Sequence, residues 1–181
     1  GANPAWRPYT RGRWVNSDQG WTWLSEEPFG WAVYHYGRWV LLAQHGWVWV
    51  PGDDWAPAWV SWRQNDDYLG WAPLPPETLY DEVYDYDPGI DLAYDVSPEY
   101  YNFVPVDHFY EPVHSHCVPR TTVVTIIIST RNVTRFSMRE NHVHCGGPEF
   151  AWVNRHARRP ARRCQIDMGM GRDHFARRHN H

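Results

Sequence analysis

Lysine is missing from this sequence of 181 residues, and all 17 basic side chains are arginines. Long hydrophobic runs are missing too, and no stretch approaches the roughly 18 apolar residues that a membrane-spanning helix needs. Cysteine is scarce, with three residues and no Cys-x-x-Cys-His motif, which excludes covalent haem attachment of the usual kind. Neither a Gly-x-Ser-x-Gly motif nor a phosphate-binding glycine loop occurs. We therefore expect no enzymatic activity, no catalytic residues and no obligatory cofactor.

Tryptophan, in contrast, is abundant, and twelve of the 13 tryptophans lie within the first 71 positions. They belong to an internal repeat. Tyr9–Val15 is echoed 25 residues later by Tyr34–Val40, and Gly20–Trp23 is echoed 26 residues later by Gly46–Trp49. The repeat supplies aromatic and glycine positions but no recurring nucleophile, acid or base. It therefore indicates a repeated structural unit rather than a catalytic one.

Residues 1–76 predict a β-module with an internal repeat, built from five or six short antiparallel strands. The expected strands are Arg11–Asn16, Trp21–Ser25, Trp31–Tyr36 continuing into Arg38–Leu42, Trp47–Val50, Trp59–Arg63 and Tyr68–Ala72. Ser17–Gly20 and Asn65–Asp67 have the composition of hairpin turns, and Pro51–Asp54 is expected to end the strand Trp47–Val50. The expected fold class is all-β. It is a small Trp-rich antiparallel barrel, for which an SH3-like barrel is one candidate, with long irregular extensions and a second β-hairpin.

Three further segments follow this module. Residues 77–119 are rich in Asp, Glu, Tyr and Pro and predict an extended segment laid over a surface through its tyrosine rings. Residues 120–140 predict a β-hairpin, with Thr121–Ser129 as a β-branched strand and Val133–Met138 as its partner. Residues 141–181 form a basic Arg/His-rich extension in which Phe150–Arg159 predicts a short amphipathic helix.

The Trp-rich motifs resemble a family of Trp-rich bacterial secreted or envelope proteins of unknown function. The motifs that carry the resemblance are Gly12-Arg-Trp-Val15, Gly20-Trp-Thr-Trp23, Glu27-Pro-Phe-Gly-Trp-Ala32, Tyr34–Val40, Gly46-Trp-Val-Trp-Val-Pro-Gly52, Trp55-Ala-Pro-Ala-Trp-Val60 and Gly70-Trp-Ala-Pro-Leu-Pro-Pro76. The resemblance covers about residues 3–135 and implies an exported protein of the periplasm or outer envelope. It implies a peripheral protein rather than a membrane-spanning one, and it transfers no catalytic residues. A start at Gly1 without Met is compatible with a processed mature chain or with an artificially trimmed one.

Trp, Tyr and Arg are the residue types enriched at the energetic centres of protein interfaces. We expect the partner-binding residues to be Trp55, Trp59, Trp62, Tyr100, Tyr101, Arg158, Arg159, Arg162, Arg163, Arg177 and Arg178. The function expected from them is a non-catalytic structural or accessory subunit, docked on the periplasmic face of a membrane-protein complex. The arginines would meet acidic subunit surfaces or anionic lipid headgroups. The acidic segment weighs against nucleic acid as a partner, because it repels phosphates. An alternative is a cell-wall or exopolysaccharide-binding module, in which exposed Trp rings stack on sugars.

A motif that occurs twice leads to a third hypothesis for the function. His114-Ser-His116-Cys117 recurs as His142-Val-His144-Cys145. If both copies are strands, the histidines of each copy share one face and the cysteine lies on the other. Four imidazoles brought together would suit a Zn or Cu site, which makes a periplasmic metal-binding protein an alternative. Cys117 and Cys145 are also candidates for a disulfide, as suits an oxidising compartment. For Cys164 three alternatives stay open, namely pairing with either of the other cysteines, pairing with a partner chain, or a free thiol.

Overall fold

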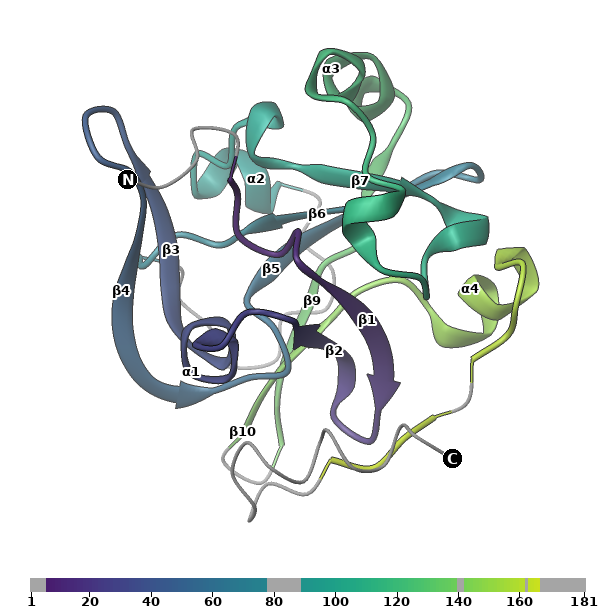
Figure 1. Cartoon of the computed structure of the whole chain (residues 1–181), viewed down its shortest axis with the longest axis horizontal. Coiled ribbons are helices and arrows are strands. Elements are labelled where there is room, and N and C mark those ends of the chain that lie inside the picture. The colour runs from purple at the N-terminus through teal and green to yellow at the C-terminus, as the bar shows by residue number, and fades with distance from the viewer. Residues whose placement is uncertain (1–5, 78–88, 140–141, 162, 167–181) are drawn as a thin grey trace.

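The computed structural model of the chain describes residues 6–77, 89–139, 142–161 and 163–166 (Figure 1). The described chain consists mostly of antiparallel strands joined by a few short helices, which confirms the all-β fold class. Within this part of the chain, no helix is long and apolar enough to cross a membrane.

Three successive hairpins form the Trp-rich part of the chain, and the two copies of the sequence repeat lie in the first two of them. They are β1 (Gly12–Ser17) with β2 (Gly20–Ser25), β3 (Tyr36–Leu42) with β4 (Gly46–Trp55), and β5 (Val60–Gln64) with β6 (Tyr68–Pro73). Each hairpin places one tryptophan directly opposite another: Trp14 opposite Trp23, Trp39 opposite Trp49, and Trp62 opposite Trp71. The repeat therefore encodes the cross-strand Trp pairs of the first two hairpins, and the third hairpin has a pair of the same kind outside the repeat. Such pairs stabilise hairpins.

The other strands extend this arrangement. β7 (Asn102–Pro105) pairs with β6, and β8 (Arg131–Asn132) pairs with β5, which gives a four-stranded sheet in the order β7-β6-β5-β8. β9 (Arg135–Arg139) pairs with β10 (His142–Gly146). Among the described residues, the strands form this sheet and three two-stranded sheets, and no closed barrel results. The predicted barrel is wrong because the hairpins meet largely through Trp rings, as Trp14 of β1 does with Trp62 of β5 at 4.5 Å.

The helices are short. They are α1 (Gly30–His35), α2 (Ile90–Ala93), α3 (Arg120–Ile128) and α4 (Phe150–His156), with the 3-10 turns η1 (Pro98–Tyr100), η2 (Val106–His108) and η3 (Val113–Ser115). The helix predicted within Phe150–Arg159 is confirmed. Two predictions for the Trp-rich module are wrong. The predicted strand Trp31–Tyr36 lies mostly in the helix α1, and Pro51–Asp54, which was expected to end a strand, lies inside β4.

The predicted strand Thr121–Ser129 is the helix α3, so the hairpin expected over residues 120–140 is also wrong. The buried residues of α3 are Val123 and Ile126, whereas Val124 and Ile128 are 56% and 82% exposed. This spacing of three is that of a helix face, and a strand would have placed residues 124, 126 and 128 on one side. β-branched residues lower helix propensity by at most about 0.7 kcal/mol each, so the burial of one helical face decides the outcome here.

One glycine is required for the close approach of two strands. Gly37 has a φ of 69° and lies where the pairing register of β3 and β4 shifts between Tyr36 and Arg38. A Cβ atom at this position would lie 2.1 Å from the carbonyl oxygen of Val50. Only glycine combines this left-handed conformation with such a contact.

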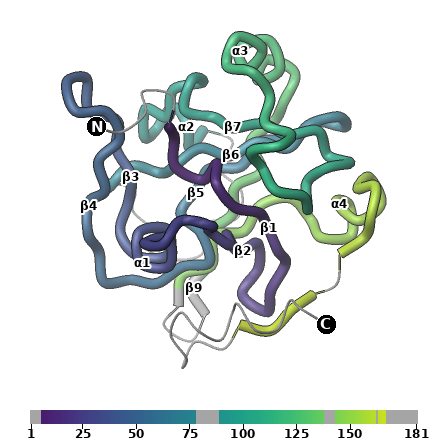
Figure 2. The backbone as a smooth tube through the Cα atoms, in the orientation of Figure 1, coloured from purple at the N-terminus to yellow at the C-terminus, as the bar shows by residue number. Residues whose placement is uncertain are grey.

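The hydrophobic core contains residues from all four segments that were distinguished in the sequence. Its largest cluster combines tryptophans of the hairpins, such as Trp14 and Trp71, with Phe109, Val133 and Val153 from later in the chain. Figure 2 shows the later, green part of the backbone running alongside the purple and blue hairpins. The described part of the acidic segment is thus not laid over a surface, because its residues supply the edge strand β7 of the four-stranded sheet and fully buried aromatic rings.

Candidate binding cleft and histidine cluster

Four of the residues expected to bind a partner lie in the core instead. Trp55, Trp59, Trp62 and Tyr101 are 6%, 1%, 0% and 0% exposed, so in this structure their side chains fill the interior and do not form a surface for a partner. The module has few large aliphatic side chains, and its tryptophans fill the interior in their place. The Tyr101 hydroxyl donates to Ser61 or Asp91, with each oxygen 2.8 Å away, and burial raises the pKa of Tyr101 well above its ordinary value.

The remaining residues of that prediction lie at the surface or outside the described chain. Tyr100 is half-buried, and Arg158, Arg159 and Arg163 are exposed. Arg162, Arg177 and Arg178 lie outside the described residues. A role in partner binding for the described arginines stays a prediction.

A cleft of about 680 Å³ opens where the start of the chain passes between the β3–β4 hairpin and η1. We call it the aromatic cleft. It is lined by Trp6, Arg7, Arg11, Glu27, Phe29, Trp39, Leu41, His45, Gly46, Trp47, Glu99, Tyr100 and Arg120. Sequence reasoning identified only Tyr100 of this set. The others come from segments far apart in the chain, and no local pattern brings them together.

Polar anchors hold the ring of Trp6 in one wall of the aromatic cleft. Its Nε1–H donates to Glu27 Oε1 at 2.8 Å, and the Tyr34 hydroxyl donates to the other oxygen of the same carboxylate. The Trp6 ring also packs against Trp39, with ring centroids 5.2 Å apart. Glu27 therefore already has two donors, and its main task is to position these aromatic side chains.

Trp47 and Tyr100 also line the aromatic cleft. Their ring centroids are 5.4 Å apart and their planes are inclined at 72°. Both side chains are half-buried, so each presents part of its ring to solvent. Trp47 comes from β4 and Tyr100 from η1, so this contact ties the β3–β4 hairpin to the second half of the chain.

Charged groups complete the lining. Arg7 is buried and donates to the backbone oxygen of Tyr101 at 3.2 Å, while Arg11 and Arg120 are exposed. Glu99 is exposed as well. Such a cleft offers partly open aromatic surface together with arginine donors. Such a lining is suited to binding.

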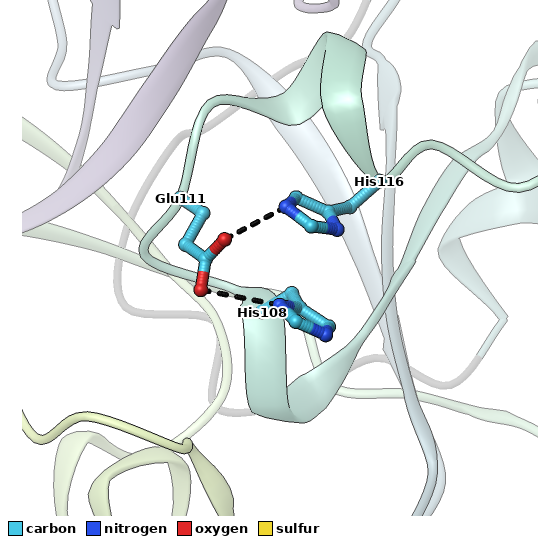
Figure 3. A group of neighbouring side chains, drawn as sticks. All are labelled: His108, Glu111 and His116. Carbon is cyan, nitrogen blue, oxygen red and sulfur yellow. Dashed lines mark hydrogen bonds and ion pairs between the residues drawn. The ribbon is translucent and has the colours of Figure 1, made fainter.

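A second candidate site lies on the turns that follow β7 (Figure 3). His108 Nδ1 is 3.1 Å from one oxygen of Glu111, and His116 Nε2 is 2.7 Å from the other. The two imidazole rings are stacked, with centroids 4.1 Å apart and planes inclined at 7°. The hydrogen bond from His108 lowers the pKa of the Glu111 carboxyl, and His116 adds to this shift. Three possible metal-ligand atoms thus lie within 4.8 Å of one another.

The twin His-x-His-Cys motif is not assembled as expected. Residues 113–115 form η3 rather than a strand, so His114 and His116 do not share a strand face. His114 lies 3.9 Å from Glu26, and His144 Nδ1 lies 3.2 Å from the backbone oxygen of Gln19. The side chain of His142 lies outside the described residues. In the described part, the four-imidazole site is replaced by a cluster that shares only His116 with it.

The predicted disulfide between Cys117 and Cys145 is also wrong, since all three cysteines are free thiols. Cys117 packs against the largest core cluster beside Arg7, whereas Cys145 lies in a second cluster and donates to the backbone oxygen of Val60. Burial raises the pKa of Cys145 to about 12, so this thiol stays protonated. The two cysteines thus belong to different core clusters and are not paired.

Comparison with known proteins adds one match. Residues 1–78 match the model of a family of unknown function, DUF6600. No curated protein and no solved structure matches the chain significantly. The match links the Trp-rich hairpins to an uncharacterised family and assigns no activity to them.

Proposed function

We propose that the chain is a non-catalytic accessory protein of the cell envelope that binds an extended segment of a partner protein in its aromatic cleft. The resemblance of the Trp-rich motifs to bacterial envelope proteins supports the location. The partner is taken to belong to a membrane-bound complex exposed on the periplasmic side. The observation that carries the proposal is the cluster of partly open aromatic rings around the cleft.

The chemistry of the lining favours a peptide. Phe29 is 45% exposed and Leu41 is half-buried, so the cleft lining includes aliphatic and phenyl surface in addition to the Trp and Tyr rings. Grooves lined by aromatic side chains commonly accept extended peptides, whose limited flexibility reduces the entropy lost on binding. Exposed Arg11 and Arg120 add donors for acidic side chains or backbone oxygens of the segment.

The test is a co-purification from the membranes of the source organism, compared between the wild-type chain and cleft variants. Trp47→Ala and Tyr100→Ala each remove a ring that a bound segment would contact. Truncation of a central interface residue costs about 2 kcal/mol or more, so the affinity for the partner should fall roughly thirtyfold or more. Quantitative mass spectrometry of the recovered subunits measures this loss.

Trp152→Ala is the matched control, because Trp152 is also half-buried but lies on α4, away from the cleft lining. The control variant should recover the partner as the wild-type chain does. Thermal unfolding of each variant shows whether it is folded. Equal recovery by folded cleft variants and the wild-type chain would rule out this binding surface.

A second candidate function is binding of cell-wall polysaccharide or exopolysaccharide. It is supported by the inclined rings of Trp47 and Tyr100, because aromatic faces of this kind stack on sugars. The row of exposed Trp and Tyr that this function would favour on a sheet face is missing from the described chain, where no Trp is more than half-exposed. This second function would be favoured if the wild-type chain co-purified with glycan but no partner protein, and if both cleft variants failed to recover the glycan.

A further inference from the structure

The cluster of His108, Glu111 and His116 is not used by the proposed function, and its geometry is that of a metal site. We propose that these three side chains bind a divalent transition-metal ion of the zinc type. The ligand atoms are His108 Nδ1, His116 Nε2 and one carboxylate oxygen of Glu111, the atoms that face one another in Figure 3.

The separations of these atoms suit a small ion. Glu111 oxygens lie 3.1 Å and 2.7 Å from the facing nitrogens of His108 and His116. A tetrahedral zinc ion has bonds of about 2.1 Å to nitrogen and oxygen, which places two of its ligand atoms roughly 3.4 Å apart. Ion binding therefore requires the Glu111 carboxylate, which is on an exposed side chain, to withdraw by a fraction of an ångström.

The backbone that carries these side chains is fixed by its neighbours. Phe109 and Val113, which lie between the proposed ligands in sequence, are 0% and 1% exposed. Backbone hydrogen bonds close the turns, from Glu111 N to the His108 oxygen at 2.9 Å and from His116 N to the Val113 oxygen at 3.0 Å. Because buried anchors alternate with the ligands, the site exists before an ion arrives, and little ordering entropy opposes binding.

A further carboxylate lies where second-shell groups of metal sites are found. Asp107 Oδ2 lies 3.6 Å from His108 Nε2, the ring nitrogen that does not face Glu111. A histidine that binds a metal commonly donates its other ring N–H to a carboxylate, which fixes the tautomer and makes the ligating nitrogen more basic. A small rotation of Asp107 would complete this arrangement.

The donor set selects the class of ion. Two imidazole nitrogens and one carboxylate oxygen suit zinc and its neighbours in the first transition row, whereas magnesium and calcium prefer oxygen ligands alone. The side chains of His108, Glu111 and His116 are 23%, 39% and 25% exposed, so an ion can reach them and would keep positions open to solvent. Structural zinc sites have four protein ligands and no open position, so a site with three protein ligands and an open position is not of that type.

The experiment is a zinc titration of the purified full-length chain by equilibrium dialysis, compared with the variants His116→Asn, Glu111→Ala and Asp107→Asn. The chain has 11 histidines, so the difference between proteins is the readout rather than the total zinc bound. We expect His116→Asn and Glu111→Ala to bind one zinc equivalent less than the wild-type chain. Asp107→Asn should retain that equivalent with an affinity reduced about ten- to a hundredfold.

His114→Asn is the matched control, because His114 lies on the adjacent turn with a side chain that is 54% exposed and faces Glu26. It should bind zinc as the wild-type chain does. All substituted side chains are partly exposed, and thermal unfolding without metal verifies the fold of each variant. Equal zinc stoichiometry in the wild-type chain, His116→Asn and Glu111→Ala, or the absence of zinc binding by the wild-type chain, would overturn the proposal.

Discussion

At the scale of single residues, His35 shows how the Trp-rich interior changes the chemistry of a side chain. The ring is 2% exposed and stacks against Trp55 at 5.5 Å, and its Nδ1 lies 2.9 Å from the backbone oxygen of Ala56. Since a carbonyl oxygen only accepts, Nδ1 carries the proton of a neutral imidazole. Burial lowers the pKa of His35 from 6.5 to about 4.

This lowered pKa predicts a pH dependence of the stability. Between about pH 6.5 and pH 4, the unfolded state binds a proton at His35 that the folded state does not. The contribution of His35 to stability is therefore fully present above pH 6.5 and is lost as the pH falls toward 4. From pH 7 to pH 5 the loss is on the order of 2 kcal/mol.

Urea unfolding at these two pH values measures the effect. A His35→Gln variant should lose less stability between pH 7 and pH 5 than the wild-type chain. His45→Gln, at an exposed position, should keep the wild-type difference. A His35 variant with an unchanged pH difference would show that this histidine is not buried in its neutral form.

At the scale of elements, the sequence predicted the first and third Trp-rich hairpins well, but of the four α-helices it predicted only α4 as a helix. Strands β1, β2, β5 and β6 were predicted within a residue or two, because alternating aromatic residues around short polar turns are a local signal. α3 was missed because its run of Val, Thr and Ile has strand composition, and only its neighbours in the fold select the helix. η3 was missed for a similar reason, and with it the environment of His114 and Cys117.

The helical form of α3 predicts a contrast between two neighbouring isoleucines. Ile126→Ala removes a side chain that is 6% exposed and should cost about 2–5 kcal/mol, whereas Ile128→Ala alters one that is 82% exposed and should cost less than about 0.5 kcal/mol. Residues 126 and 128 would share a face in a strand. Equal losses of unfolding free energy for the two variants would therefore contradict the helix.

At the scale of the whole molecule, the residues that make the sites come together only through the common core. Trp6, Trp47 and Tyr100 meet at the aromatic cleft from the start of the chain, from β4 and from η1. The sequence marked the abundance of aromatic rings but could not distinguish those that fill the core, such as Trp62, from those that line the cleft. The spacing of residues along a strand indicates which of them share a face of that strand. Whether that face is exposed depends on how several elements pack together. The histidine cluster lies within nine residues of sequence, and His108-x-x-Glu111 near His116 was a signal that could have been found.

Binding of a partner in the aromatic cleft is tested most directly by site-specific photo-crosslinking in living cells from position 29, where p-benzoyl-phenylalanine replaces a phenylalanine that lines this cleft and is 45% exposed. The same probe at position 92 is the control, because Leu92 is 90% exposed and lies outside this cleft. We expect a discrete crosslinked envelope protein from position 29, lost in the Trp47→Ala background, and none from position 92. A partner captured only from position 92, or crosslinks from position 29 that Trp47→Ala leaves unchanged, would contradict binding in the aromatic cleft.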